Sequence, residues 1–89
     1  MSTKAEVFVP KSHWLKIAPQ YLEAHKKGLK SFEIRRNDRN YKIGNALVLQ
    51  EWTERGGFTG QNVVREITYI TDFPDGLKPG YIVMGLRPL

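Results

Sequence analysis

The segment GLKSFEIRRNDR, residues 28–39, combines a helix stop with a strand of alternating polarity. Its leading glycine is predicted to end a short helix, because glycine adopts the left-handed conformation at helix ends without steric cost. Successive side chains of a strand point to opposite faces, so Phe32 and Ile34 share one face and Glu33 and Arg35 share the other. We expect the charged face to point away from the core.

The residues around this segment predict a mostly β domain with one helix. Pro19 suits the first turn of a helix that runs to about Lys27, and His13–Ile17 before it alternates as a strand. Further strands are expected over residues 46–53, 63–71 and 81–87, separated by turn formers. Five or six strands and one helix predict an α+β domain with a closed or nearly closed β-barrel.

Residues 1–12 are polar and lack a hydrophobic period, although Val7–Val9 is a candidate edge strand. We expect this segment to be partly mobile, with one domain over residues 13–89.

The motif Gly28-x-Lys30-x-x-Glu33-x-Arg35 resembles the signature G-x-K-x-x-E-x-R of the ASCH domains, a branch of the PUA-like β-barrels. The resemblance extends over most of the chain, from residues 13–17 to 80–84. The span is similar to a small ASCH-like family of uncharacterised bacterial and phage proteins. The resemblance implies a PUA-like barrel with a cleft between the helix and the signature strand, in which a nucleotide or flipped base is accepted.

Positive charge is concentrated around this motif. The chain carries a net charge of +5, and residues 26–42 hold seven basic residues against two acidic ones, while the rest of the chain is balanced. Clustered positive charge indicates an anion or nucleic-acid site, because phosphate neutralisation supplies most sequence-independent affinity. The alternative is a solvated basic face that keeps a small protein soluble.

Lys30, Glu33 and Arg35 are the first candidate binding residues. A guanidinium group clamps a phosphate or a base edge in a bidentate manner, and an ammonium group acts as a point charge. Glu33 is a candidate acceptor for a base amino group or an orienting partner of Arg35. The structural alternative is a Lys–Glu–Arg network that ties the helix to the sheet.

Other candidates come from the flanking residues. Arg36, Arg39 and Lys42 are expected to contact phosphates. Tyr41 is the first choice for stacking on a base, and His13 for the pocket wall. The alternatives are a core position for the tyrosine and a satisfied hydrogen bond for the histidine.

Missing residue types exclude several classes of site. Without cysteine the chain has no disulfide or thiolate chemistry, and His13 and His25 lack metal-ligand spacing, so no metal or cofactor is expected. The longest aliphatic run, Ala46–Leu49, is too short to span a membrane, and no signal peptide is recognised. We expect a cytoplasmic monomer.

The sequence therefore predicts a nucleic-acid-binding module for RNA or a modified nucleotide, with the preference for RNA implied by the resemblance. A second hypothesis is a small amidohydrolase of modified nucleosides. Some ASCH domains are identified as amidohydrolases of acetylated cytidine; their lysine corresponds to Lys30, but Glu33 stands in place of their threonine. Such an enzyme would use Lys30 and Glu33 as its acid–base pair. A third hypothesis is a phage-type interaction module whose basic face meets an acidic protein partner.

Overall fold

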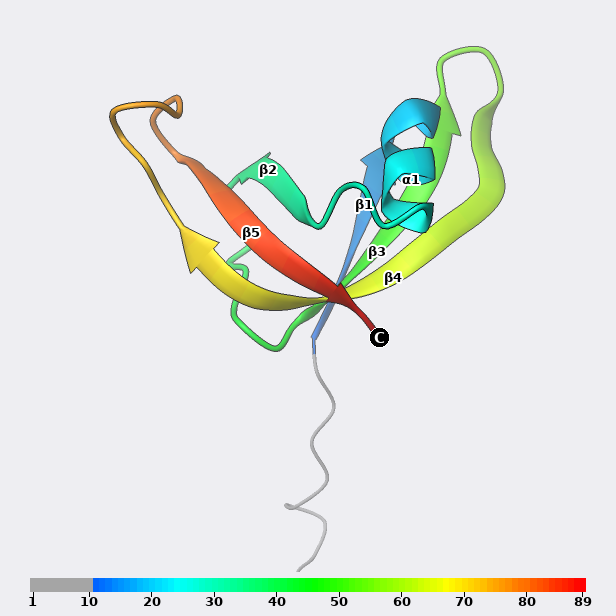
Figure 1. Cartoon of the computed structure of the whole chain (residues 1–89). Coiled ribbons are helices and arrows are strands. Elements are labelled where there is room, and N and C mark those ends of the chain that lie inside the picture. The colour runs from blue at the N-terminus through cyan, green and yellow to red at the C-terminus, as the bar shows by residue number, and fades with distance from the viewer. Residues whose placement is uncertain (1–10) are drawn as a thin grey trace, which may run out of the picture.

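The structure is a computed structural model that describes residues 11–89. Its elements follow in the order β1 (Ser12–Ile17), α1 (Pro19–Lys26), β2 (Phe32–Arg36), β3 (Ala46–Thr53), β4 (Gly57–Thr71) and β5 (Tyr81–Pro88). The five strands form one sheet in the order β1-β3-β4-β5-β2, in which β1 and β3 are parallel and all other neighbours antiparallel. Figure 1 shows the strongly curved sheet with α1 beside β1 and β3. The predicted α+β, mostly β class with a barrel-like sheet is confirmed.

Helix α1 has the sequence signals expected at both ends. Proline opens its first turn, and Gly28 follows the C-cap residue Lys27 with φ of +75°. The Gly28 N–H donates to the His25 carbonyl at 3.1 Å, and the Leu29 N–H donates to the Ala24 carbonyl at 2.9 Å. These two bonds form a Schellman motif, which satisfies carbonyls that the helix itself leaves unpaired. The chain therefore leaves α1 in a fixed direction and enters β2 five residues after Lys27.

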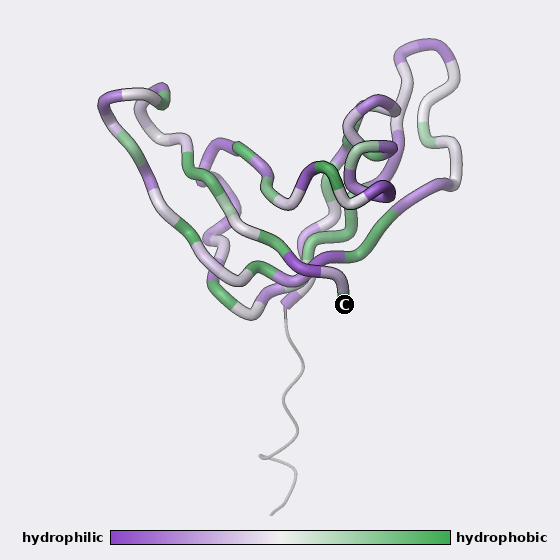
Figure 2. Tube along the Cα trace, viewed as in Figure 1, coloured by the Kyte–Doolittle hydropathy of each residue, from purple (hydrophilic) through white to green (hydrophobic). Residues whose placement is uncertain are grey.

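The core lies on the inner side of the curved sheet and beneath α1. Figure 2 shows hydrophobic residues along the middle of β3 and β5, whereas the tip of the β3–β4 hairpin is hydrophilic. Leu22 of α1 is 1% exposed and belongs to this core. The buried apolar cluster comprises Leu15, Ile17, Leu22, Tyr41, Leu47, Leu49, Ile67, Ile82, Met84 and Leu86.

The two faces of β2 are reversed relative to the sequence-based expectation. Glu33 is only 4% exposed, whereas Phe32 and Ile34 are 41% and 47% exposed. The charged face thus points inward, because basic side chains satisfy the carboxylate there. The alternation of β2 is therefore as predicted, but the prediction that its charged face points away from the core is wrong.

The sheet is a half-barrel and stops short of closure. β1 and β2 are its two edges, and no backbone ladder joins them in the described part of the chain. Two arginine side chains bridge them instead: Arg35 of β2 donates to the Lys16 carbonyl at 2.9 Å, and Arg39 donates to the Trp14 carbonyl at 3.0 Å. These guanidinium groups pair carbonyls that an adjacent strand would otherwise bind, and they cover part of an exposed edge.

One difference concerns the boundary of a strand. β4 begins at Gly57 rather than at Val63, because the β3–β4 hairpin continues to the pair formed by Thr53 and Gly57. The predictions for residues 1–12, including the strand candidate Val7–Val9, fall almost wholly outside the described residues. Within residues 11–89, no helix is both long and apolar enough to cross a membrane.

Replacing Gly28 tests the helix stop. Gly28→Ala is expected to destabilise the fold by about 1–2 kcal/mol, because a Cβ atom is disfavoured in the left-handed conformation while nothing lies within 4 Å to clash with it. Urea denaturation measures the change. Gly28→Asn is the matched control and should lose less stability, since asparagine tolerates this conformation. Equal losses of stability in the two variants would contradict the backbone explanation.

Candidate ligand-binding cleft

A buried carboxylate organises the site. The Glu33 Oε2 atom accepts from the His25 Nε2 atom at 2.8 Å and from the Lys30 Nζ atom at 2.6 Å. The Oε1 atom accepts from the Arg35 Nε atom at 3.0 Å, and the Arg35 Nη2 atom lies 2.9 Å away from it. Glu33 therefore ties α1, the turn after it and β2 together.

The environment of Glu33 keeps it ionised. Burial by itself raises the pKa of this carboxyl, but the hydrogen bonds from Lys30 and His25 and the charge of Arg35 outweigh it, so the pKa lies below its ordinary value. The His25 Nε2 atom donates to the carboxylate, and its Nδ1 atom is buried without a partner among the described residues. A fully saturated carboxylate of lowered pKa is a poor proton acceptor and a good structural anchor.

The two cations keep unused donors. Lys30 donates to Glu33 and to the Phe32 carbonyl at 2.8 Å, which accounts for two of its three N–H groups. Arg35 uses its Nε and Nη2 atoms, whereas its Nη1 atom makes no hydrogen bond to residues 11–89. Fixed cations with unused donors are suited to an anionic or polar ligand.

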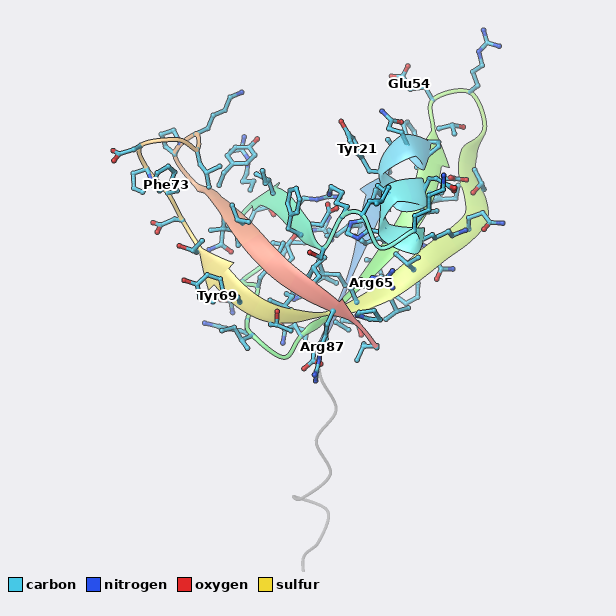
Figure 3. The ribbon with its side chains drawn as sticks, in the orientation of Figure 1. Tyr21, Glu54, Arg65, Tyr69, Phe73 and Arg87 are labelled. Carbon is cyan, nitrogen blue, oxygen red and sulfur yellow. The ribbon has the colours of Figure 1, made fainter. Side chains whose placement is uncertain are left out.

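These donors face an open cleft of about 580 Å³, which we call the α1–β2 cleft. It is lined by the end of β1 from Lys16 to Ala18, by Tyr21 and Lys30, and by β2 from Phe32 to Arg35. The Lys30 Nζ atom lies 4.7 Å from the centre of the Phe32 ring and 5.5 Å from that of Tyr21. Figure 3 shows Tyr21 on the side of α1 that faces β2 and β5. The cleft therefore combines two aromatic rings with the cations of Lys30 and Arg35, and Lys16 also lines it.

Tyr41 and His13 are placed elsewhere than expected. Tyr41 is 5% exposed and His13 is 4% exposed, and their ring centres lie 4.6 Å apart. The His13 Nε2 atom is 2.9 Å from the Asn45 Oδ1 atom, which also accepts from the Lys42 N–H. Burial leaves neither ring a free face for a base, so this pair holds the loop before β3, and we leave both residues out of the proposed site.

The other basic candidates do not line the α1–β2 cleft. Arg36 is the last residue of β2 and pairs with Tyr81 of β5, with its guanidinium carbon 5.4 Å from the centre of the Tyr81 ring. Arg39 is held by the Trp14 carbonyl, and Lys42 is exposed in the connection between β2 and β3. Their role as phosphate contacts stays a prediction for a surface outside the cleft.

Sequence reasoning missed Tyr21, Phe32 and His25 as parts of the site. Phe32 was assigned to the core, and Tyr21 and His25 lie on a helix that offered no ligand pattern. The helical spacing of Tyr21 and His25 was the available signal, because it places both on the side of α1 that faces the sheet. No group of three or more potential metal-ligating side chains occurs in the part of the chain that the structure describes.

The chain matches one protein-family model over most of its length. Residues 12–86 match a domain of unknown function, DUF3850. The chain belongs to the DUF3850 family. The match runs from the first residue of β1 to Leu86 in β5, so it includes both sides of the α1–β2 cleft.

A phage protein is related to this DUF3850 domain. The chain is 41% identical over 68 residues to an uncharacterised 12.9 kDa protein in the GpA 3′ region of Escherichia phage P2. That stretch is 76% of this chain and 62% of the phage protein, so the DUF3850 domain spans less than two thirds of its relative. The expected kinship with a small family that includes phage proteins is confirmed, whereas the relation to ASCH domains stays a prediction.

Loss of the Glu33 carboxylate should destabilise the DUF3850 domain strongly. Glu33→Ala leaves Lys30 and Arg35 partly buried without their anion, and breaking a buried ion pair costs about 3–5 kcal/mol. Glu66→Ala is the matched control, because it breaks a more exposed pair with Arg87, worth about 0–1 kcal/mol. Urea denaturation of both variants measures the difference, and similar losses would contradict the anchor role.

The same carboxylate should make stability depend on pH. Because the pKa of Glu33 is lowered on folding, its contribution is complete above the ordinary value of 4.5 and is lost as the pH falls through the lower folded-state value. The stability difference between the natural protein and Glu33→Gln should therefore shrink on acidification from about pH 6 to pH 3. Urea denaturation across this range tests the expectation, and a constant difference would contradict it.

Proposed function

We propose that this DUF3850 domain binds RNA or a nucleotide in the α1–β2 cleft. The observation that carries the proposal is the arrangement of the Tyr21 and Phe32 rings around Lys30, beside the unused Nη1 donors of Arg35. Aromatic rings offer faces on which a base stacks, and the two cations offer charge for a phosphate or donors for a base edge.

Size and shape agree with such a ligand. A volume of about 580 Å³ lies within the roughly 300–1,000 Å³ of small-molecule sites. The cleft is open, and hydrogen bonds already hold Lys30, Glu33 and Arg35 together in the absence of a ligand. A ligand would meet side chains that lose little further freedom on binding, which favours affinity.

The sequence motif adds a separate line of support. The resemblance to ASCH domains rests on Lys30, Glu33 and Arg35, and all three are charged residues that line the cleft. The preference for RNA over DNA in this proposal rests on that resemblance, because neither charge nor aromatic rings distinguish the two.

The chemistry of the cluster favours binding over hydrolysis. An acid–base role for Lys30 and Glu33 needs a carboxylate that takes up a proton from substrate or water. Both oxygens of Glu33 are instead occupied by three basic side chains, and its lowered pKa weakens it as a base. We therefore assign Glu33 the role of holding Lys30 and Arg35 in place.

An amide NMR titration of the full chain with a short mixed-sequence single-stranded RNA tests the proposal. Chemical shift changes should cluster on Tyr21, Lys30, Phe32 and Arg35 and should persist at about 0.15 M salt, since stacking is not screened. Weak changes spread over surface lysines that disappear with salt would contradict it.

Tyr21 provides the sharpest variant because it is 51% exposed and its loss leaves the Glu33 network intact. Tyr21→Ala should weaken RNA binding by roughly 5- to 150-fold, which corresponds to the 1–3 kcal/mol of one base–aromatic stack. Tyr21→Phe retains the ring and should bind normally. Tyr69→Ala is the surface control: Tyr69 is 62% exposed and lies on the arm of the sheet away from α1 (Figure 3). Equal effects of Tyr21→Ala and Tyr69→Ala would argue against the cleft.

A further inference from the structure

A second cleft of about 580 Å³ lies on the other side of the end of β1. Its walls are the start of α1 at Pro19 and Gln20, the end of β3 at Trp52 and Thr53, and Glu54 just after β3. We call it the hairpin cleft, because Trp52 pairs with Phe58 across the β3–β4 hairpin. Phe58 is 55% exposed, so this end of the hairpin presents aromatic surface to solvent.

The two clefts are adjacent and share three lining residues. Lys16, Ile17 and Ala18 line both of them, so a single short ridge separates the α1–β2 cleft from the hairpin cleft. The side chain of Ile17 is buried, whereas Lys16 is exposed. Lys16 is therefore the basic side chain on the ridge itself.

Lys16 already contacts the aromatic surface of the hairpin cleft. Its Nζ atom lies 4.4 Å from the centre of the Trp52 ring and 5.9 Å from that of Phe58. A lysine ammonium on a flexible four-carbon stem can leave such a ring for a phosphate a short distance away. Displacement of the ammonium would free the ring face for a base.

We propose that the two clefts hold consecutive nucleotides of one single strand, with one base in the α1–β2 cleft, the next against Trp52, and Lys16 on the phosphate between them. This inference rests on the proposed function and names its ligand class: a single strand of at least two nucleotides rather than a free nucleotide. Alternation of aromatic surface and cation is the arrangement by which single strands are bound without reading their sequence.

The acidic side chain of the hairpin cleft limits the length of the site. Glu54 lies at the tip of the β3–β4 hairpin (Figure 3) and lines the end of the cleft away from the α1–β2 cleft. Its charge disfavours a further phosphate there. Affinity should therefore rise from one nucleotide to two and gain little beyond that.

Fluorescence separates the two clefts, because the chain contains only two tryptophans, Trp14 and Trp52. In the full chain with Trp14→Phe, Trp52 is the sole tryptophan, and its emission reports on the hairpin cleft. The probes are the four ribonucleoside monophosphates and mixed-sequence di- and tetranucleotides of RNA. Amide shifts of Tyr21 and Phe32 report on the α1–β2 cleft in the same samples.

We expect monophosphates to shift Tyr21 and Phe32 without changing Trp52 emission. Dinucleotides should also quench Trp52 and bind roughly tenfold tighter or more, with little further gain for tetranucleotides. Lys16→Ala should remove most of this gain, so that dinucleotides bind this variant little more tightly than monophosphates do. Lys78→Ala, an exposed lysine outside both clefts, is the control and should leave the gain unchanged.

The outcomes distinguish this inference from the proposed function. One outcome is that Tyr21 and Phe32 shift, that all ligand lengths bind equally well and that Trp52 emission is unchanged. It would overturn the two-cleft site and leave the α1–β2 cleft as a nucleotide site. Absence of shifts at Tyr21 and Phe32 with every probe would overturn both. Quenching of Trp52 without shifts at Tyr21 and Phe32 would show an independent site and would also overturn the shared one.

Discussion

The structure depends on the buried carboxylate of Glu33. It receives hydrogen bonds from a histidine of α1, from Lys30 in the turn and from Arg35 of its own strand, and Arg35 extends this network to the carbonyl of Lys16 in β1. One side chain thus fixes the helix to the sheet and the two edges of the half-barrel to each other. A buried carboxylate is costly without such partners, and several donors converge here to offset that cost.

The same network shapes the α1–β2 cleft. A barrel closed by a backbone ladder would leave no opening between β1 and β2, whereas guanidinium bridges hold the edges while leaving space beside them. Lys30 and Arg35 are held by Glu33 and still retain unused donors at the cleft. The fold and the proposed binding site therefore share the same three charges, and variants of Glu33 are expected to affect both. Tyr21, which is exposed and outside the network, separates the two effects.

Much of the fold was predictable because it follows from local rules. Proline at the start of α1, Gly28 after it, and the alternation in β1 and β2 each reflect a constraint within a few residues. The closeness of Lys30, Glu33 and Arg35 was likewise predictable from their spacing. The face of β2 that points inward was not predictable from the strand alone. Glu33 faces inward because His25, Lys30 and Arg35 bind its carboxylate there, and no pattern within the strand encodes those partners.

The local sequence decided where the helix and most strand boundaries lie and which charges stand side by side, since backbone conformation and short spacings act over only a few residues. Tertiary packing decided what those residues do. It buried Tyr41 and His13 against each other, used Arg39 to hold the edge of β1, and brought Tyr21 to Lys30. These contacts join segments that are separate in the chain, and the curvature of the sheet, which arises from all its strands together, sets which of them meet.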